Sequence, residues 1–145
     1  MKDFSFKIPQ DIIFGKGCLN RLPEVLKSAG CDAVYLISDP GLKGVGVVDR
    51  VEKIITEAGV KCSDFLDVQP NPTIDIVHAA LEGYKASGAK CVVALGGGSP
   101  MDVAKAVGIL ATYGGKVTDY VGFQKVPGPT IPLIAIPTTA GTGSE

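Results

Sequence analysis

The stretch Val92–Ala106, VVALGGGSPMDVAKA, decides the fold of this chain. Its first four residues are apolar and predict a strand buried on both faces, which runs directly into Gly96–Gly98. A helix is predicted to begin at once, with Ser99 as its N-cap, Pro100 in the first turn and Asp102 at the third position. An apolar strand, a glycine loop and a helix start therefore follow one another without a gap.

This junction predicts a phosphate site built from backbone groups. Glycines have no side chain, so a ligand can come within contact distance of the backbone. The start of the helix adds free N–H groups and the positive end of the helix dipole. The alternative is a tight turn without a ligand, but each glycine costs about 1 kcal/mol of backbone entropy relative to alanine.

Strand and helix patterns alternate along the rest of the chain, which predicts an α/β fold with a parallel sheet covered by helices on both faces. The predicted strands cover residues 33–38, 61–68, 91–95 and 133–136. The predicted helices cover residues 19–29, 47–58, 74 to near Gly88, and 99–111. Before them, Phe4–Ile8 and Ile12–Phe14 predict two short strands, a β-hairpin at the N-terminus.

Asp39 follows the predicted strand 33–38, where an acid reads ribose hydroxyls in dinucleotide folds. In the usual fingerprint the acid comes after the glycines, whereas Asp39 precedes Gly96. If it does the same work, the strand order must differ from the standard one. The alternative is a plain Asp-Pro-Gly turn. A second glycine stretch, Gly44–Asp49, lacks the third glycine of the fingerprint and is predicted to be loop and helix entry.

Hydroxyl side chains follow the last predicted strand: Thr138, Thr139, Thr142 and Ser144, with glycines between them. They can line a polar nucleotide wall at the strand ends; the alternative is a helix-capping loop. Thr142–Glu145 also has the form of a capping box, in which the threonine accepts from a backbone N–H and the glutamate reaches back. A capping box predicts that a further helix opens there, so we expect a chain cut at the start of its next element.

Composition narrows the class of protein. Net charge is −1 with interspersed signs, so no basic surface predicts binding to nucleic acid or to an anionic membrane. No apolar run approaches the ~20 residues of a transmembrane helix, and the first residues lack a secretory signal pattern. The cysteines form no C-x-x-C pair, which predicts a reduced cytoplasmic protein, with a metal or disulfide role as the minor alternative. They are Cys18, Cys31, Cys62 and Cys91.

Two long motifs, GGGSPMDVAKA at 96–106 and PLIAIPTTAGTGSE at 132–145, resemble the iron-containing (group III) alcohol dehydrogenases. The shorter motifs NPT at 71–73, SDPGL at 38–42 and FGKG at 14–17 fit the same family in order and spacing. The similarity is closest to the branch of lactaldehyde:propanediol oxidoreductases, 1,3-propanediol dehydrogenases and butanol dehydrogenases.

The resemblance implies a two-domain subunit. An N-terminal Rossmann-like α/β domain of the dehydroquinate-synthase-like kind would bind NAD, and a C-terminal helical domain would bind Fe²⁺ or Zn²⁺ through an Asp and three His. The implied contacts are Gly97, Gly98 and Ser99 to the pyrophosphate, Asp102 near the nicotinamide, Asp39 to the adenosine ribose, Asn71 in the cofactor cleft, and Thr138, Thr139 and Thr142 to the nucleotide.

The metal motif is the main departure from the family, because the chain has one histidine, His78, outside any such motif. We therefore expect residues 1–145 to be the NAD-binding domain of a longer enzyme, with no metal ligand and no catalytic residue of its own. The parent would interconvert primary alcohols or diols and aldehydes, as a homodimer or higher oligomer paired through its N-terminal strands. The alternatives are a glycerol or sugar-phosphate dehydrogenase of the same fold, which Ser99 disfavours since those relatives carry Lys after the glycines, and a non-catalytic nucleotide-binding or assembly module.

Overall fold

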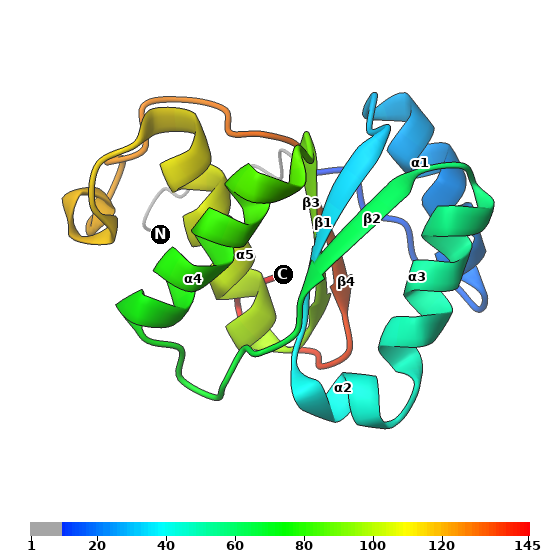
Figure 1. Ribbon diagram of the computed structural model, residues 1–145. Coiled ribbons are helices and arrows are strands. Elements are labelled where there is room, and N and C mark those ends of the chain that lie inside the picture. The colour runs from blue at the N-terminus through cyan, green and yellow to red at the C-terminus, as the bar shows by residue number, and fades with distance from the viewer. Residues whose placement is uncertain (1–9) are drawn as a thin grey trace, which may run out of the picture.

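Four parallel strands form one sheet in the order β2-β1-β3-β4 in the computed structural model, which describes residues 10–145 (Figure 1). Their bounds are Ala33–Ile37 for β1, Lys61–Phe65 for β2, Cys91–Gly96 for β3 and Leu133–Pro137 for β4. The α-helices are α1 (Leu22–Ser28), α2 (Pro40–Gly44), α3 (Val47–Glu57), α4 (Ile74–Ser87) and α5 (Gly98–Tyr113). Two 3-10 helices, η1 (Cys18–Arg21) and η2 (Val117–Tyr120), are the other helices within residues 10–145.

Helices cover both faces of the sheet: α4 and α5 lie on one side and α1 and α3 on the other (Figure 1). All six residues of β3 are buried, and their side chains alternate between the two cores. Val92 and Ala94 pack toward α4 and α5, whereas Val93 and Leu95 pack toward α1 and α3. The prediction of a parallel α/β sheet with two covered faces is confirmed.

The chain reverses its direction across the sheet between β1 and β3. From β1 it passes outward through α2 and α3 to β2, and from β3 it passes outward the other way through α5 to β4. Open α/β sheets bind ligands in the crevice at such a switch point, outside the carboxyl ends of the strands. The order also differs from the standard dinucleotide order 3-2-1-4-5-6, which is the condition under which Asp39 could contact a ribose from a position before the glycines.

The predicted N-terminal hairpin is not formed where the structure can test it. Phe4–Ile8 lies outside the described residues, and Ile12–Phe14 is not a strand. Ile12 is 73% exposed and Phe14 is 97% exposed, since no strand among residues 10–145 pairs with this segment.

One local prediction beside the glycine loop was also wrong, and one alternative is removed. Ser99 is not the N-cap of α5: the helix begins at Gly98 with Gly97 as N-cap, and no side chain caps it. Asp102 consequently lies one turn inside the helix. Asp39 does not open a plain turn but is the N-cap of α2, where its Oδ1 accepts from the backbone N–H of Leu42 at 3.0 Å. An Asp followed by Pro is a favourable helix start, which is the physical reason for α2.

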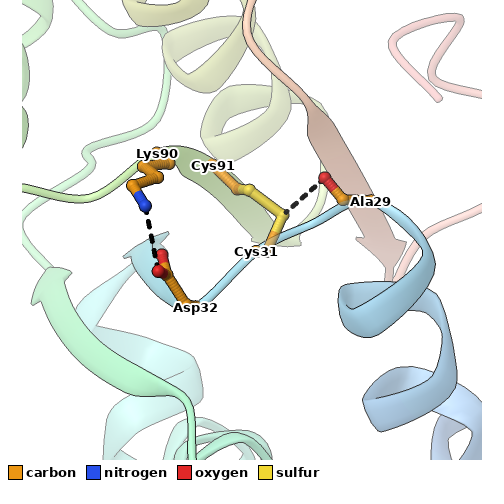
Figure 2. Close-up of a disulfide and its surroundings, with 5 residues drawn as sticks. All are labelled: Ala29, Cys31, Asp32, Lys90 and Cys91. Atoms are coloured by element: carbon orange, nitrogen blue, oxygen red, sulfur yellow. Dashed lines mark hydrogen bonds and ion pairs between the residues drawn. A yellow bond between two sulfur atoms is a disulfide. The ribbon is translucent and has the colours of Figure 1, made fainter.

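Cys31 and Cys91 form a disulfide, so the prediction of four reduced cysteines was wrong for this pair (Figure 2). β1 and β3 are neighbours, and Val34 pairs with Cys91 in the parallel register, which brings the start of β3 beside the loop before β1. The two Cα atoms are 5.9 Å apart, inside the range of roughly 4.4–6.8 Å that a disulfide spans. Beside the bond, Lys90 Nζ and Asp32 Oδ2 form an ion pair at 2.9 Å.

Cys18 and Cys62 are free thiols. No helix within residues 10–145 is both long enough and apolar enough to cross a bilayer.

Candidate functional site

A cavity of about 440 Å³ opens at the carboxyl ends of β1, β2 and β3. Three segments line it, one after each strand: Asp39–Gly41, Val68–Pro70 and Gly97–Pro100. The cavity therefore includes the switch point between β1 and β3, where the fold itself predicts a ligand. Among residues 10–145, Asp39 is the only charged residue in its lining, and no lysine or arginine of this part of the chain contributes to the wall.

The glycine loop has a conformation that only glycine fits well. Gly96 has φ +146°, and a Cβ placed on it would lie 2.6 Å from Pro100 Cγ and 3.3 Å from Asp39 Oδ2. Any side chain at this position would push apart the loop, the start of α5 and Asp39. The backbone N–H of Thr138 donates to the Gly96 carbonyl at 2.9 Å, which ties the end of β4 to the same loop.

The loop after β4 packs against the glycines from the other side. A Cβ on Gly97 would lie 2.9 Å from Thr139 Oγ1, and a Cβ on Gly98 would lie 3.4 Å from Thr142 Cβ. The structure thus brings two of the predicted threonines against the predicted glycines, across about forty residues of sequence. Thr139 and Thr142 therefore lie beside Gly97 and Gly98, although neither threonine lines the cavity itself.

The two carboxylate oxygens of Asp39 have different neighbours: one accepts a hydrogen bond within α2, and the other faces the glycine loop. Oδ1 caps α2, as described, and Oδ2 is the oxygen that a side chain on Gly96 would approach. The carboxylate is half-buried and held by the cap, so it stays oriented before any ligand arrives. A hydroxyl group of a ligand in the cavity can donate to it.

Five predicted site residues lie outside the cavity lining: Thr138, Thr139 and Thr142, which contact the glycine loop, and Asn71 and Asp102, which do not. Asn71 is exposed and follows Pro70 directly, with φ +53°, a left-handed conformation that asparagine tolerates better than most residues. Asp102 is exposed on α5, beyond the first turn of the helix. Both border the entrance region in sequence, but no described contact joins either of them to the glycine loop.

Sequence reasoning missed the wall formed by Val68, Gln69 and Pro70, and it missed Pro40 and Gly41 beside Asp39. A signal was present, because the predicted strand 61–68 ends at this wall and the carboxyl ends of parallel strands meet at one edge. Valine, glutamine, proline and glycine are not typical of a binding site by their own chemistry. Only their position directly after a strand could have identified these residues as part of the cavity wall.

The predicted capping box at Thr142–Glu145 was wrong: neither of its two reciprocal hydrogen bonds is present, and a different set of bonds closes this loop. Glu145 accepts from the Gly141 N–H at 2.9 Å and from the Thr142 hydroxyl. Thr142 Oγ1 in turn accepts from the Ser144 N–H at 3.2 Å, two residues on rather than the three that the box requires. The Thr142 hydroxyl, followed by backbone N–H donors, lowers the pKa of Glu145 to about 2. The loop that carries Thr142 over Gly98 is thus held by its own hydrogen bonds.

Comparison with known proteins gives the same family at the level of sequence and of structure. The family model described as iron-containing alcohol dehydrogenase matches residues 9–145. Alcohol dehydrogenase 4 of Schizosaccharomyces pombe is 43% identical over 141 residues, covering 97% of this chain and 33% of its own length. NAD-dependent methanol dehydrogenase of Bacillus methanolicus is 38% identical over 141 residues, covering 97% of this chain and 37% of its own.

A solved structure of 1,3-propanediol oxidoreductase superposes with a TM-score of 0.93 at 33% identity, covering 99% of this chain and 38% of that one. The chain therefore spans about a third to two fifths of the length of the relatives that it matches.

Proposed function

The chain belongs to the iron-containing alcohol dehydrogenase family, and from that premise we propose that residues 1–145 form an NAD-binding domain. One observation carries the proposal: the glycine loop after β3 and the Asp39 carboxylate face the same cavity at the switch point of the sheet. A dinucleotide needs a donor-rich site for its pyrophosphate and an acceptor for a ribose hydroxyl, and the cavity offers one on each side.

The pyrophosphate would be held by backbone. The N–H groups of Gly97, Gly98 and Ser99 stand at the start of α5, a helix of 16 residues whose positive dipole end lies there. No cationic side chain from the described part of the chain lines the cavity, so the donors that residues 10–145 offer to a phosphate are these backbone groups. The hydroxyls of Thr139 and Thr142 would extend the same cradle.

The adenosine ribose would be held by Asp39, and we propose Asn71, Asp102 and Thr138 as residues at the margin of the cofactor. NAD, when bound, accepts or donates the hydride of the reaction; the chain binds and orients it. We propose that the whole enzyme interconverts primary alcohols or diols and aldehydes, with a small alcohol as substrate.

The family's metal does not fit the described part of this chain. Within residues 10–145, no group of three or more His, Cys, Asp or Glu side chains is placed to hold an ion. His78 is exposed on α4, on its own. A divalent iron or zinc ion would therefore have to be held by residues of another domain.

The chain of 145 residues is expected to oxidise no alcohol, even with added metal. Purified chain would be mixed with NAD, ethanol or 1,3-propanediol, and Fe²⁺ or Zn²⁺, and NADH would be followed by its absorbance. Because residues 10–145 hold no cluster of metal ligands that could place an ion against the alcohol oxygen, the rate should equal that of a protein-free control. NADH formation that depends on both protein and metal would contradict the proposal that this chain binds NAD and that another domain holds the metal.

Asp39 is expected to set the preference for NAD over NADP. A 2′-phosphate would meet the carboxylate and no compensating cation, so the wild-type chain should bind NAD well ahead of NADP in calorimetric titrations. Asp39→Gly should narrow this ratio by about tenfold or more, the value of one charge-assisted hydrogen bond. Asp39→Asn is the matched variant, because asparagine keeps the cap of α2 and removes only the charge.

These titrations distinguish a wrong role for Asp39 from a wrong role for the whole domain. An unchanged NAD/NADP ratio in both variants would remove the ribose role from Asp39 alone. A wild-type chain that binds neither cofactor would contradict the proposal that residues 1–145 suffice to hold NAD.

Assembly and location complete the proposal. We propose a homodimer or higher oligomer that covers the exposed apolar segment around Phe14, which light scattering after gel filtration would test by mass.

We propose a cytoplasmic location because NAD is a cofactor of reactions inside the cell. Under that proposal the Cys31–Cys91 disulfide would be in contact with the reducing glutathione pool.

A further inference from the structure

The hydroxyl of Ser38 joins the two strand ends that flank the cavity. Ser38 follows β1 and is completely buried, and its Oγ donates to the backbone carbonyl of Leu95 in β3 at 2.8 Å. The parallel pairing of β1 with β3 ends one step earlier, at Ile37 opposite Ala94. The side chain thus adds one cross-strand bond where the backbone pairing has stopped.

The backbone of Ser38 joins β1 to the third wall of the cavity. Its N–H donates to the Phe65 carbonyl at the end of β2, at 2.9 Å. Its carbonyl accepts from the N–H of Val68 at 3.3 Å, and Val68 begins the wall after β2. Ser38 therefore connects, through three hydrogen bonds, the strand ends from which the three lining segments of the cavity begin.

The neighbours of the Ser38–Leu95 bond are the two groups proposed to hold the cofactor. Asp39 follows Ser38 directly, and Gly96 follows Leu95 directly. The clearance between them is small, since a Cβ on Gly96 would already lie 3.3 Å from Asp39 Oδ2. A shift of either strand end would change the distance between the carboxylate and the glycine loop.

We infer that Ser38 is a positioning residue for dinucleotide binding: its hydroxyl fixes the distance between Asp39 and the glycine loop. The inference rests on the proposed function, since only a ligand that contacts both groups is sensitive to their separation. The residue touches no cofactor itself, as it is fully buried beneath the cavity. Its effect on affinity passes through Asp39.

A double-mutant cycle tests this, because a residue that acts through Asp39 loses its effect when Asp39 is changed. Ser38→Ala is expected to weaken NAD binding about tenfold in the wild-type background, the value of one hydrogen bond of ordinary strength. In the Asp39→Asn background, the same change should weaken binding less than about twofold. The dissociation constant of NADH is measured by fluorescence titration for the wild type, for each single variant and for the double variant.

Ser87→Ala is the matched control. Ser87 makes the same kind of bond, from its Oγ to the carbonyl of Tyr84 at 2.7 Å, at the end of α4 and outside the cavity lining. Its loss should lower the melting temperature and leave NAD affinity unchanged. A fall in affinity that merely follows stability would appear in this variant as well.

The outcomes are distinct. An equal loss in both Asp39 backgrounds, no loss in either, or an equal loss in Ser87→Ala would overturn the inference. A wild-type chain that does not bind NADH would overturn the proposed function and the inference with it. If Ser38→Ala does not fold, Ser38→Cys enters the same cycle, because a thiol fills the same space and donates only weakly.

Discussion

Replacing Gly96 with alanine is expected to weaken NAD binding by at least about 100-fold. The new Cβ would lie 2.6 Å from Pro100 Cγ, a distance that requires the start of α5 to move away from β3. The N–H groups of Gly97 and Gly98 would move with it. Losing two charge-assisted hydrogen bonds to the pyrophosphate, each of about 1.5 kcal/mol or more, corresponds to a change of this size.

The backbone conformation adds a second cost, and a control variant separates it. Gly96 has φ +146°, which alanine adopts only under strain of about 1–3 kcal/mol. Gly59 after α3 also has positive φ, +77°, but no atom lies within 4 Å of a Cβ built on it. Gly59→Ala should therefore lower stability and keep the NAD affinity of the wild type. Titration of both variants at a temperature where both are folded makes the comparison, and unaltered affinity in Gly96→Ala would argue against a loop shaped for a ligand.

Reduction of the Cys31–Cys91 disulfide is expected to lower the free energy of unfolding by about 4 kcal/mol. The bond closes a loop with a sequence separation of 60 residues, and the entropy that such a loop removes from the unfolded chain has this magnitude. The melting temperature should fall by about 10 °C for a domain of this size. Thermal unfolding followed by circular dichroism, with and without a phosphine reductant, measures the difference.

Counting thiols tests the bond directly. In denaturant without reductant, two thiols should react, and with reductant four should react, since Cys18 and Cys62 are free. Denaturant is needed because burial raises the pKa of the Cys62 thiol to about 11, which keeps it from reacting as a thiolate in the folded protein. Cys18→Ala is the matched control and should leave the effect of the reductant on melting unchanged. Four reactive thiols before reduction would contradict the disulfide.

Several features could be predicted from the sequence because they are local. The apolar run of β3, the glycines after it and the apolar helix α5 are contiguous, so their order alone predicts a strand, a loop and a helix start. The position of Asp39 before the glycines predicted a non-standard strand order only on the condition that Asp39 contacts a ribose. The N-cap of α5 could not be predicted in the same way. Gly97 and Ser99 are two residues apart, and hydrophobic periodicity does not locate the first residue of a helix that closely.

The order of apolar runs, glycines and polar residues is therefore enough to predict the fold class and the polar groups at the ends of the strands. Which of these groups meet depends on how the strands pair in space. Cys31 faces Cys91, the Ser38 hydroxyl bonds Leu95, and Thr139 lies against Gly97 because β1 and β4 both flank β3. The physical reason is that hydrophobic periodicity reports which face of an element is buried, whereas these contacts depend on which strands pair and in what register.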